Sequence, residues 1–424
     1  MPALSPVPHE YRAAVPPRGL GGYTISSEHL IAVFYIFFLI SIARIGINFV
    51  PATNQIFWII AYAWVAMAFA RQPSLYLTLI RNNAVFFLGP LFATCSAFWS
   101  VMPGFTAFSG ISIVLGVIVG FYFYERLGLK KIIILTFCFS LFIQILSPIV
   151  ALMLREVNVA GGLETRGLYL HKNNFSMHAN LLFLGGMVLF ASGWYRPLAA
   201  IGIVVSLINV VFSGSSTGIL MTFLITAVLA CCWAAVGNRR QSMLIFGMGI
   251  VSVSVIVAAI AIAGFDPVEF VLNELGKDST LTGRTILWDA AIRSFNARPW
   301  LGVGYAAFWN SDQTEAPSIW ILTGQALVSF HNNYLDRLVD VGIIGLVLFM
   351  AGYIQVFYRS LRNFGKEQTV IAAWPVAYLS LVAGLCMSEY PIFWNTEFQL
   401  LLSVIAAAVA GVKVDGVNDR MRRS

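Results

Sequence analysis

The chain has 424 residues, of which 59% are hydrophobic and 11% are charged, with a formal net charge of +7. Soluble globular domains carry charge on about a quarter of their residues, so the composition excludes that class and predicts a polytopic membrane protein. The sequence also lacks the alternating pattern of lipid-facing β-strands, so the predicted fold class is all-α. The five cysteines lie in or beside apolar runs and show neither a disulfide framework nor metal-ligand spacing.

Apolar runs of about 20 residues, the length that an α-helix needs to cross a bilayer, recur along the chain. We expect about twelve transmembrane helices. The predicted spans lie near 30–50, 55–70, 84–100, 107–124, 132–153, 175–192, 197–213, 217–236, 243–264, 334–357, 369–388 and 395–412.

The distribution of basic residues predicts the orientation. Lys and Arg in the short connections gather on one side, for example at Arg71, Lys131 and Arg240, which marks that side as cytoplasmic. The predicted organisation is a cytoplasmic tail (1–28), helices one to nine (29–264) with a periplasmic loop (154–174), a long periplasmic loop (265–333), helices ten to twelve (334–412) and a cytoplasmic tail (413–424). The cations of the two periplasmic loops indicate an anionic partner outside the membrane, and the spread of the charge argues against nucleic acid.

Three helices that enter from the outer face begin with polar residues. The sixth opens at His171-Lys172-Asn173, the eighth at Ser213 to Thr217 and the tenth at His331-Asn332-Asn333, with Asp336 three residues later as in a capping box. One interpretation is simple helix capping. The other is that three helix N-termini on one face direct partial positive charge at a phosphate group.

The long loop contains one predicted amphipathic helix, within 282–295. Its apolar residues are spaced helically at 288, 291, 292 and 295, Pro299 ends it, and Gly302-Val303-Gly304 follows. We interpret the Gly-x-Gly as a tight turn rather than a phosphate loop. We expect the helix to lie along the outer membrane surface, over the helix bundle.

The candidates for acid–base chemistry are His171 and His331, which both lie at outer helix starts. His178 falls inside the sixth helix, where a packed residue is the simpler interpretation. No converging set of three or four metal ligands is visible, so we expect neither a metal nor a cofactor. For Arg337, an ion pair with Asp336 or Asp340 on its own helix is favoured over anion binding.

Phosphate recognition is assigned to other cations. Arg284, Arg166 and Lys172 are the candidates, because a guanidinium donates two parallel hydrogen bonds to a phosphate and an ammonium acts as a point charge. For Arg284 and Lys172, few acids lie nearby in the sequence.

Several motifs together resemble the O-antigen ligase and polysaccharide polymerase superfamily, in the right order between about residues 90 and 350. The motifs are Ser96-Ala97-Phe98-Trp99-Ser100-Val101-Met102-Pro103, Arg166-Gly167 with His171-Lys172-Asn173, Gly283-Arg284 with Trp288, Pro299 with Gly302-Val303-Gly304, and His331-Asn332 with Gly342 and Gly345. The His-Lys-Asn variant is more similar to the exopolysaccharide repeat-unit polymerases than to the lipopolysaccharide ligases.

The resemblance implies a helical fold similar to the GT-C-type membrane glycosyltransferases. It also implies a metal-independent, inverting glycosyl transfer at the periplasmic face of a bacterial inner membrane. The donor would be a glycan on undecaprenyl pyrophosphate and the acceptor a sugar hydroxyl, with His331 as general base. Arg284 with Arg166 or Lys172 would hold the pyrophosphate, supported by Asn173, Ser216, Asn332 and His171. A further candidate partner is a chain-length regulator.

One departure concerns the start of the eighth helix. Many members of the superfamily have a Ser-Arg pair there, whereas this chain has Ser213-Gly214-Ser215-Ser216-Thr217. Lys172 and Arg166 are the cations available to replace that Arg, and hydroxyls with the helix N-terminus are the alternative.

Polymerisation of lipid-linked repeat units is the leading functional hypothesis. A ligase that transfers the finished glycan to lipid A core, or to protein, would use the same donor and almost the same active residues. From a different class, a transporter of the lipid-linked glycan would require charges along a path through the bilayer and similar halves of the chain. No convincing inverted repeat is visible.

Overall fold

The computed structural model describes residues 27–42, 53–153, 165–169, 171–236, 284–389 and 398–411. Within these ranges every regular element is a helix, in agreement with the predicted all-α class. The predicted ninth span (243–264), most of the two tails and the first part of the long loop lie outside the described residues.

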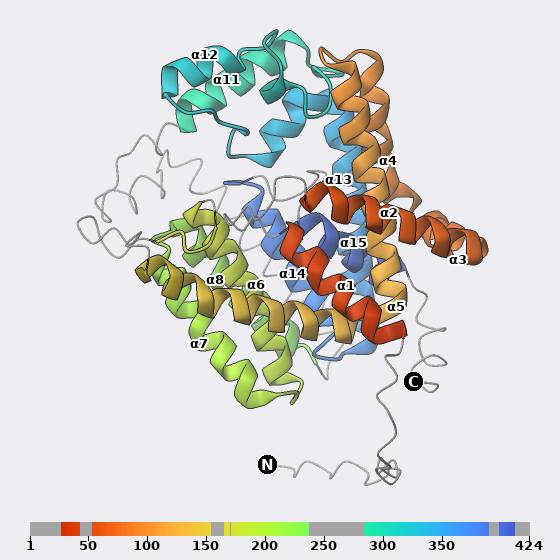
Figure 1. Ribbon diagram of the computed structural model, residues 1–424, viewed down its shortest axis with the longest axis vertical. Coiled ribbons are helices and arrows are strands. Elements are labelled where there is room, and N and C mark those ends of the chain that lie inside the picture. The colour runs from red at the N-terminus through yellow and green to blue at the C-terminus, as the bar shows by residue number, and fades with distance from the viewer. Residues whose placement is uncertain are drawn as a thin grey trace.

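The described α-helices follow the chain from α1 to α15 (Figure 1). Their bounds are α1 (Ser27–Ile42), α2 (Thr53–Arg71), α3 (Pro73–Asn82), α4 (Ala84–Cys95), α5 (Pro103–Met153), α6 (Lys172–Ala191), α7 (Arg196–Phe212), α8 (Ser216–Ala234), α11 (Arg284–Ala297), α12 (Ala316–Thr323), α13 (Asn333–Glu367), α14 (Ala373–Leu385) and α15 (Phe398–Gly411). Two short 3₁₀ turns, Ser96–Phe98 and Phe308–Asn310, complete the described elements.

Four of the described helices, α5, α6, α8 and α13, are long and apolar enough to cross a membrane. A fifth span results if α3 and the segment Ala84–Phe98 are counted together, although the two are bent by 90°. The sequence did not predict α3, a largely exposed helix of 10 residues. The count of twelve spans stays a prediction.

The longest helix, α5, contains a break at Gly128. This residue has φ +67° and ψ +164°, a non-helical conformation that glycine adopts without steric cost. The two halves run in different directions in Figure 1, where they are coloured orange and gold. The break lies between the predicted spans 107–124 and 132–153, so the structure agrees with two helices in this region.

Exposed apolar side chains form stripes with helical spacing on two helices. On α7 the stripe is Ile201, Val204, Ile208 and Val211, and on the second half of α5 it is Phe142, Ile145, Ile149 and Leu152. Water solvates such contiguous apolar surfaces poorly, whereas lipid tails solvate them well. The stripes therefore indicate helices that face a hydrocarbon environment.

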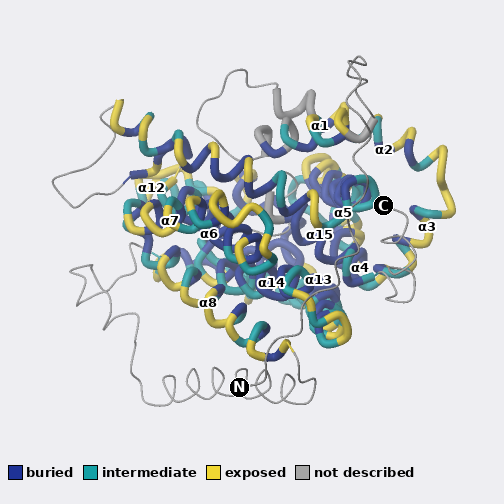
Figure 2. The backbone as a smooth tube through the Cα atoms, turned by 90° about the horizontal axis from the view of Figure 1, so that it is seen from below, coloured by how far each residue is buried: buried dark blue, intermediate teal, exposed yellow. Residues whose placement is uncertain are grey.

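The buried core is centred on α14 and α15. Most of their described side chains are buried, and Figure 2 shows dark blue residues gathered there while α3 and the outer sides of α7 and α8 are exposed. Helices α11 and α12 lie together at one end of the molecule, at the top of Figure 1, and pack over a second apolar cluster that includes Leu287, Phe308 and Phe330.

The turn at Gly302 and Gly304 packs against a break in α13. Gly342 interrupts that helix with φ +65°, and the carbonyls of Val339 and Asp340 accept hydrogen bonds from Val303 N (3.0 Å) and Gly304 N (2.8 Å). A Cβ on Gly302 would lie 2.5 Å from the backbone of Asp340, so only glycine fits this approach. The glycines therefore form a structural turn, as the sequence predicted.

The motif at Ser96 to Pro103 supports the same turn from its other side. Ser96 Oγ accepts a hydrogen bond from Tyr305 N (2.9 Å), Val101 N donates to Val303 O (2.9 Å), and Trp99 Nε1 donates to Leu301 O (2.9 Å). Three of the motifs that carry the resemblance thus form one structural clamp, which holds the described part of the long loop on the first turns of α13.

The amphipathic face predicted for the long-loop helix is partly wrong. Helix α11 buries Leu287, Ala290 and Ala291, whereas Ile292 is 50% exposed. The helix packs closely on the other residues of its own loop and on α13, and the small alanines suit this contact. Its predicted position along the membrane surface stays a prediction.

Candidate functional site

The side chain of Glu389 is the centre of a polar cluster where several helix ends meet. Its Oε1 accepts a short hydrogen bond from Asn173 Nδ2 and lies 3.4 Å from Arg284 Nη2. Its Oε2 lies 3.6 Å from His331 Nδ1. These three partners come from the first turn of α6, the first residue of α11 and the loop before α13, so one carboxylate joins three segments that are distant in the sequence.

The starts of α6 and α8 are joined to this cluster through Asn173. Its Oδ1 accepts a hydrogen bond from Ser215 Oγ (3.1 Å), while the same hydroxyl caps α8 by accepting from Gly218 N (3.2 Å). Gly218 allows the approach, because a Cβ there would lie 2.6 Å from Ser176 on α6. The hydroxyl that bonds to Asn173 is that of Ser215, whereas the predicted Ser216 is the first helical residue of α8.

The start of α13 completes the cluster. Asn333 N donates to the carbonyls of Cys386 (2.8 Å) and Glu389 (3.1 Å), at the C-terminal end of α14. The structure thus brings together the three polar helix starts that the sequence singled out. The N-cap of α13 is Asn332, whose Oδ1 accepts from Tyr334 N and Leu335 N, so the predicted capping box of Asn333 and Asp336 is wrong. The third residue after the cap is Leu335, and Asp336 Oδ1 accepts from Phe330 N instead.

His331 is fixed in a strained backbone conformation. Its φ of +52° lies in the left-handed region, which costs a non-glycine residue about 1 kcal/mol or more. The preceding Phe330 is held on both sides, because its N–H donates to Asp336 Oδ1 (3.0 Å) and its carbonyl accepts from Trp288 Nε1 (3.1 Å). The surroundings therefore determine where the imidazole lies, as is common at functional sites.

The imidazole of His331 has one inner and one outer nitrogen. Nδ1 is buried and makes no hydrogen bond to any described residue, and its nearest charged neighbour is the Glu389 carboxylate at 3.6 Å. The side chain as a whole is 24% exposed. Since Nδ1 is enclosed, the accessible part of the ring is the side that carries Nε2.

The three predicted phosphate-binding cations lie in different settings. Arg284 is 17% exposed and pairs with Glu389, an acid 105 positions away that the sequence pattern did not connect to it. Lys172 is the partly buried first residue of α6, beside the cluster. Arg166 is exposed on the segment 165–169, which Thr165 joins to the end of α7 through Phe212 O (2.9 Å).

His171 is a helix cap in this structure. Its Nδ1 accepts a hydrogen bond from Asn173 N (3.2 Å), which requires an unprotonated Nδ1. Partial burial of the ring lowers its pKa below the usual 6.5; the Glu389 carboxylate opposes this shift, while His331, Lys172 and Arg284 act in the same direction as burial. His171 is thus held neutral, and its Nδ1 lone pair is used by the helix cap.

Two further sequence hypotheses can be compared with the structure. Arg337 is 1% exposed and its Nη2 lies 3.2 Å from Asp340 Oδ2, so the favoured ion pair within α13 is confirmed. His178 is buried and stacked on Tyr169, with ring centroids 4.8 Å apart, as expected for a packed residue. Among the described residues, no group of three or more His, Cys, Asp or Glu side chains is arranged to hold a metal ion.

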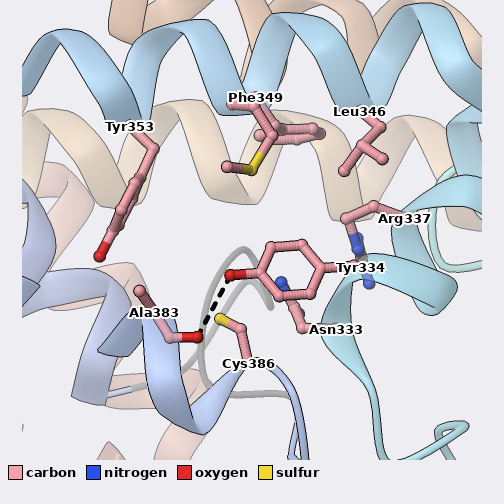
Figure 3. A pocket seen from close by; sticks show the side chains of 9 residues that line it. Asn333, Tyr334, Arg337, Leu346, Phe349, Tyr353, Ala383 and Cys386 are labelled. Carbon is pink, nitrogen blue, oxygen red and sulfur yellow. Dashed lines mark hydrogen bonds between the residues drawn. The ribbon is translucent and has the colours of Figure 1, made fainter. Parts of the chain in front are cut away.

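A small space lies beside the cluster, between α13 and α14 (Figure 3). Its walls are mainly apolar, including Leu346, Phe349 and Tyr353, and its end near the cluster is formed by Asn333 and Cys386. The Tyr334 hydroxyl crosses this space and donates to Ala383 O (3.2 Å). An apolar space thus adjoins the charged cluster directly.

Sequence reasoning missed Glu389. It is a single acid immediately after the predicted span 369–388, and its partners lie 58 to 216 positions away in the sequence. An ionisable residue at the end of an apolar run was the available signal, because such a charge is costly unless it is paired.

The fold and the cluster together define a class: a multi-pass helical membrane protein in which an imidazole, a carboxylate and a guanidinium meet at helix ends. Residues 201–350 match the model of the O-antigen ligase family, a segment that contains both Arg284 and His331. The exopolysaccharide production protein ExoQ of Rhizobium meliloti (strain 1021) is 30% identical over 208 residues.

The match to ExoQ covers 47% of this chain and 48% of that protein, so the chain spans about half the length of the relative it matches. The two matches agree with the resemblance of the motifs to the O-antigen ligase and polysaccharide polymerase superfamily. Together with the apolar helices they indicate a multi-pass membrane protein.

Proposed function

We propose that the protein polymerises polysaccharide repeat units by transferring a glycan from undecaprenyl pyrophosphate to a sugar hydroxyl at the periplasmic face. The observation that carries the proposal is the juxtaposition of His331 and Arg284 around Glu389, inside or beside the segment that matches the O-antigen ligase family. A base and an anion-binding group are the two functions that such a transfer requires.

The proposed reaction is a single inverting displacement. The acceptor hydroxyl oxygen attacks the anomeric carbon of the donor glycan, its proton passes to His331, and the bond from that carbon to the pyrophosphate oxygen breaks. Undecaprenyl pyrophosphate leaves with the bonding electron pair. Arg284 stabilises the charge that develops on the leaving group, with Lys172 or Arg166 as the second cation and the N-termini of α6 and α8 nearby.

The direct test is His331→Ala in a reconstituted assay with a lipid-linked donor. Loss of a general base lowers turnover by about 10²- to 10⁴-fold. Arg293→Ala is the matched control, because Arg293 lies on α11 like Arg284 but forms an exposed pair with Glu315. Turnover of His331→Ala within about threefold of wild type would contradict the general-base role.

The role of Arg284 is tested in the same assay by varying the donor concentration. Arg284→Ala is expected to raise the KM for the donor more than that for the acceptor, because the phosphates lose a charged contact. Equal activity at low donor concentration would remove Arg284 from the donor site. The transfer is also expected to continue in excess chelator, and loss of activity that added divalent metal restores would contradict the metal-independent mechanism.

A ligase is the second candidate, favoured by the description of the matching family as O-antigen ligase. The name of ExoQ, an exopolysaccharide production protein, favours the polymerase. The two differ in the phenotype of a deletion strain. Loss of long chains with retention of single repeat units indicates a polymerase, whereas accumulation of long lipid-linked chains indicates a ligase.

A further inference from the structure

The carboxylate of Glu389 is shared unequally between Arg284 and His331. Oε1 lies 3.4 Å from Arg284 Nη2, within hydrogen-bonding distance, whereas Oε2 lies 3.6 Å from His331 Nδ1, just beyond it. Nδ1 is nevertheless enclosed and makes no hydrogen bond to the described residues. An enclosed ring nitrogen without a hydrogen bond is costly, so a small movement of the carboxylate toward His331 would be favourable if Arg284 released it.

The rest of the Glu389 residue is held in place. Its N–H donates to Leu385 O (2.8 Å) and its carbonyl accepts from Asn333 N (3.1 Å). In the side chain, Oε1 accepts from Asn173 Nδ2, a contact about which the carboxylate can still turn. The backbone is therefore fixed at the end of α14 while the carboxylate lies between two cationic or proton-donating partners. The adjustable part of the cluster is the carboxylate together with the partly exposed Arg284 side chain.

A pyrophosphate group competes for Arg284 on favourable terms. The guanidinium contacts Glu389 through a single nitrogen in the described contacts, and its planar fork can bind a phosphate through two parallel hydrogen bonds. Lys172 and the N-termini of α6 and α8 add positive potential at the same place. A bound pyrophosphate therefore replaces the counter-ion that Glu389 provides in its absence.

We propose that Glu389 is a positioning residue that donor binding transfers from Arg284 to His331. When the pyrophosphate takes Arg284, the carboxylate moves onto Nδ1–H of His331 and fixes the tautomer whose Nε2 accepts the acceptor proton. Binding of the donor thereby completes the base. The inference rests on the proposed function and deepens it, because it assigns the order in which the same site is assembled.

The test is Glu389→Gln, which keeps the shape of the side chain and an oxygen that accepts from Asn173 but removes the charge. Two quantities are measured on the full-length protein: the Kd for inorganic pyrophosphate, by calorimetry, and kcat with lipid-linked donor. Pyrophosphate is expected to bind about threefold or more tightly, since one competing ion pair is lost. In the same variant kcat is expected to fall at least about tenfold, because His331 loses the group that orients it.

Opposite changes in affinity and turnover distinguish this role from a structural one. A variant that merely disturbs the cluster weakens pyrophosphate binding and turnover together, and that result would overturn the proposal. Glu315→Gln is the matched control, because its carboxylate pairs with Arg293 in an exposed setting, and both quantities should stay at the wild-type value. Unchanged kcat in Glu389→Gln would also overturn the proposal.

Glu389→Asp provides a second measurement, which can be made even if the Glu389→Gln protein does not fold. The shorter side chain keeps the charge but spans less distance, so kcat is expected to fall less than in Glu389→Gln while pyrophosphate affinity stays near the wild-type value. Weaker turnover than in the Gln variant would contradict the charge requirement. If the wild-type protein transfers no glycan from a lipid-linked donor, the proposed function is wrong. If it does, and pyrophosphate affinity and kcat do not change in opposite directions in Glu389→Gln, only the movement of Glu389 from Arg284 to His331 is wrong.

Discussion

Two groups of charged side chains at the beginning of α13 differ in burial and in the origin of their partners. In the first, Asp336, Arg337 and Asp340 are 3%, 1% and 4% exposed, and the Arg337 guanidinium also lies 4.9 Å from the ring centre of Tyr305. All three belong to α13, whose chain continues from the loop that carries His331. Their partners therefore come from one helix and from the loop packed on it.

The second group is the cluster around Glu389, whose members have more exposure and more distant partners. Arg284 and His331 are 17% and 24% exposed, and they come from different elements. The comparison indicates that the buried group fixes the loop on the helix, whereas the Glu389 cluster is accessible enough to exchange partners with a ligand. Similar residue types serve different purposes because one set is enclosed and the other is open on one side.

The largest expected effect is on stability, from Arg337→Ala. Removing one partner leaves Asp340 as an uncompensated buried charge, and such a change costs about 3–5 kcal/mol. We expect a strongly lowered Tm in detergent and a reduced amount of protein in the membrane. Arg293→Ala is the control for removing an arginine, since an exposed pair contributes about 0–1 kcal/mol. Equal Tm values for the two variants would remove the distinction between the buried and exposed groups.

The buried group was partly predictable from the sequence, because its members are close in the chain. A spacing of three residues places Arg337 and Asp340 on the same face of a helix, so their pairing follows from helix geometry alone. The same reasoning found the polar helix starts at His171 and Asn332, because capping is a local interaction. Local rules thus predicted the polar helix starts and the ion pair within α13.

Glu389 was not predictable by those rules. Its contacts with Asn173 and Arg284 join residues 216 and 105 positions apart, and only the packing of α6, α11 and α14 brings them together. The face of α11 was misplaced for a related reason. Periodicity identifies a helix, but the choice of buried side depends on what packs against it, and here Ala290 and Ala291 fit the approach better than Ile292 does.

A smaller effect is expected from Gly342→Ala, which disturbs the clamp between the two groups. Gly342 has φ +65°, and a Cβ would lie 2.3 Å from Trp300 O, so the strain should cost at least about 1–3 kcal/mol. Gly365→Ala in the same helix is the control, because nothing lies within 4 Å of its Cβ position, and alanine there should be neutral or stabilising by up to about 1 kcal/mol. Both are measured by Tm.

Glycosyl transfer by the Gly342→Ala variant then sharpens the comparison. If the clamp places His331, the fraction that remains folded should transfer glycan more slowly than wild type, with a lowered kcat and little change in donor KM. Wild-type kcat in the folded fraction would show that the loop position is set by the hydrogen bonds to Phe330 alone.

The smallest expected effect concerns pH and the cap at His171. Because the folded-state pKa of His171 is lowered, the unfolded chain binds its proton more readily. The stabilising contribution of the cap is therefore present above about pH 6.5 and is lost as the pH falls through that value toward the folded pKa. Protonation of Nδ1 removes the acceptor for Asn173 N and frees the first turn of α6.

Hydrogen exchange of the first-turn amides of α6 measures this loss. The protection factor at Asn173, which is the ratio of the intrinsic to the observed exchange rate, should fall between pH 7 and pH 5 in the absence of donor. His171→Asn is the matched control, because asparagine caps a helix without titrating, and its exchange should follow the intrinsic dependence alone. If both proteins respond alike, the pH sensitivity belongs to the Glu389 cluster and not to the cap. Asn173 also donates to Glu389, so loss of the cap at low pH should loosen that carboxylate in the wild type. Acidification should therefore slow glycosyl transfer more in the wild type than in His171→Asn.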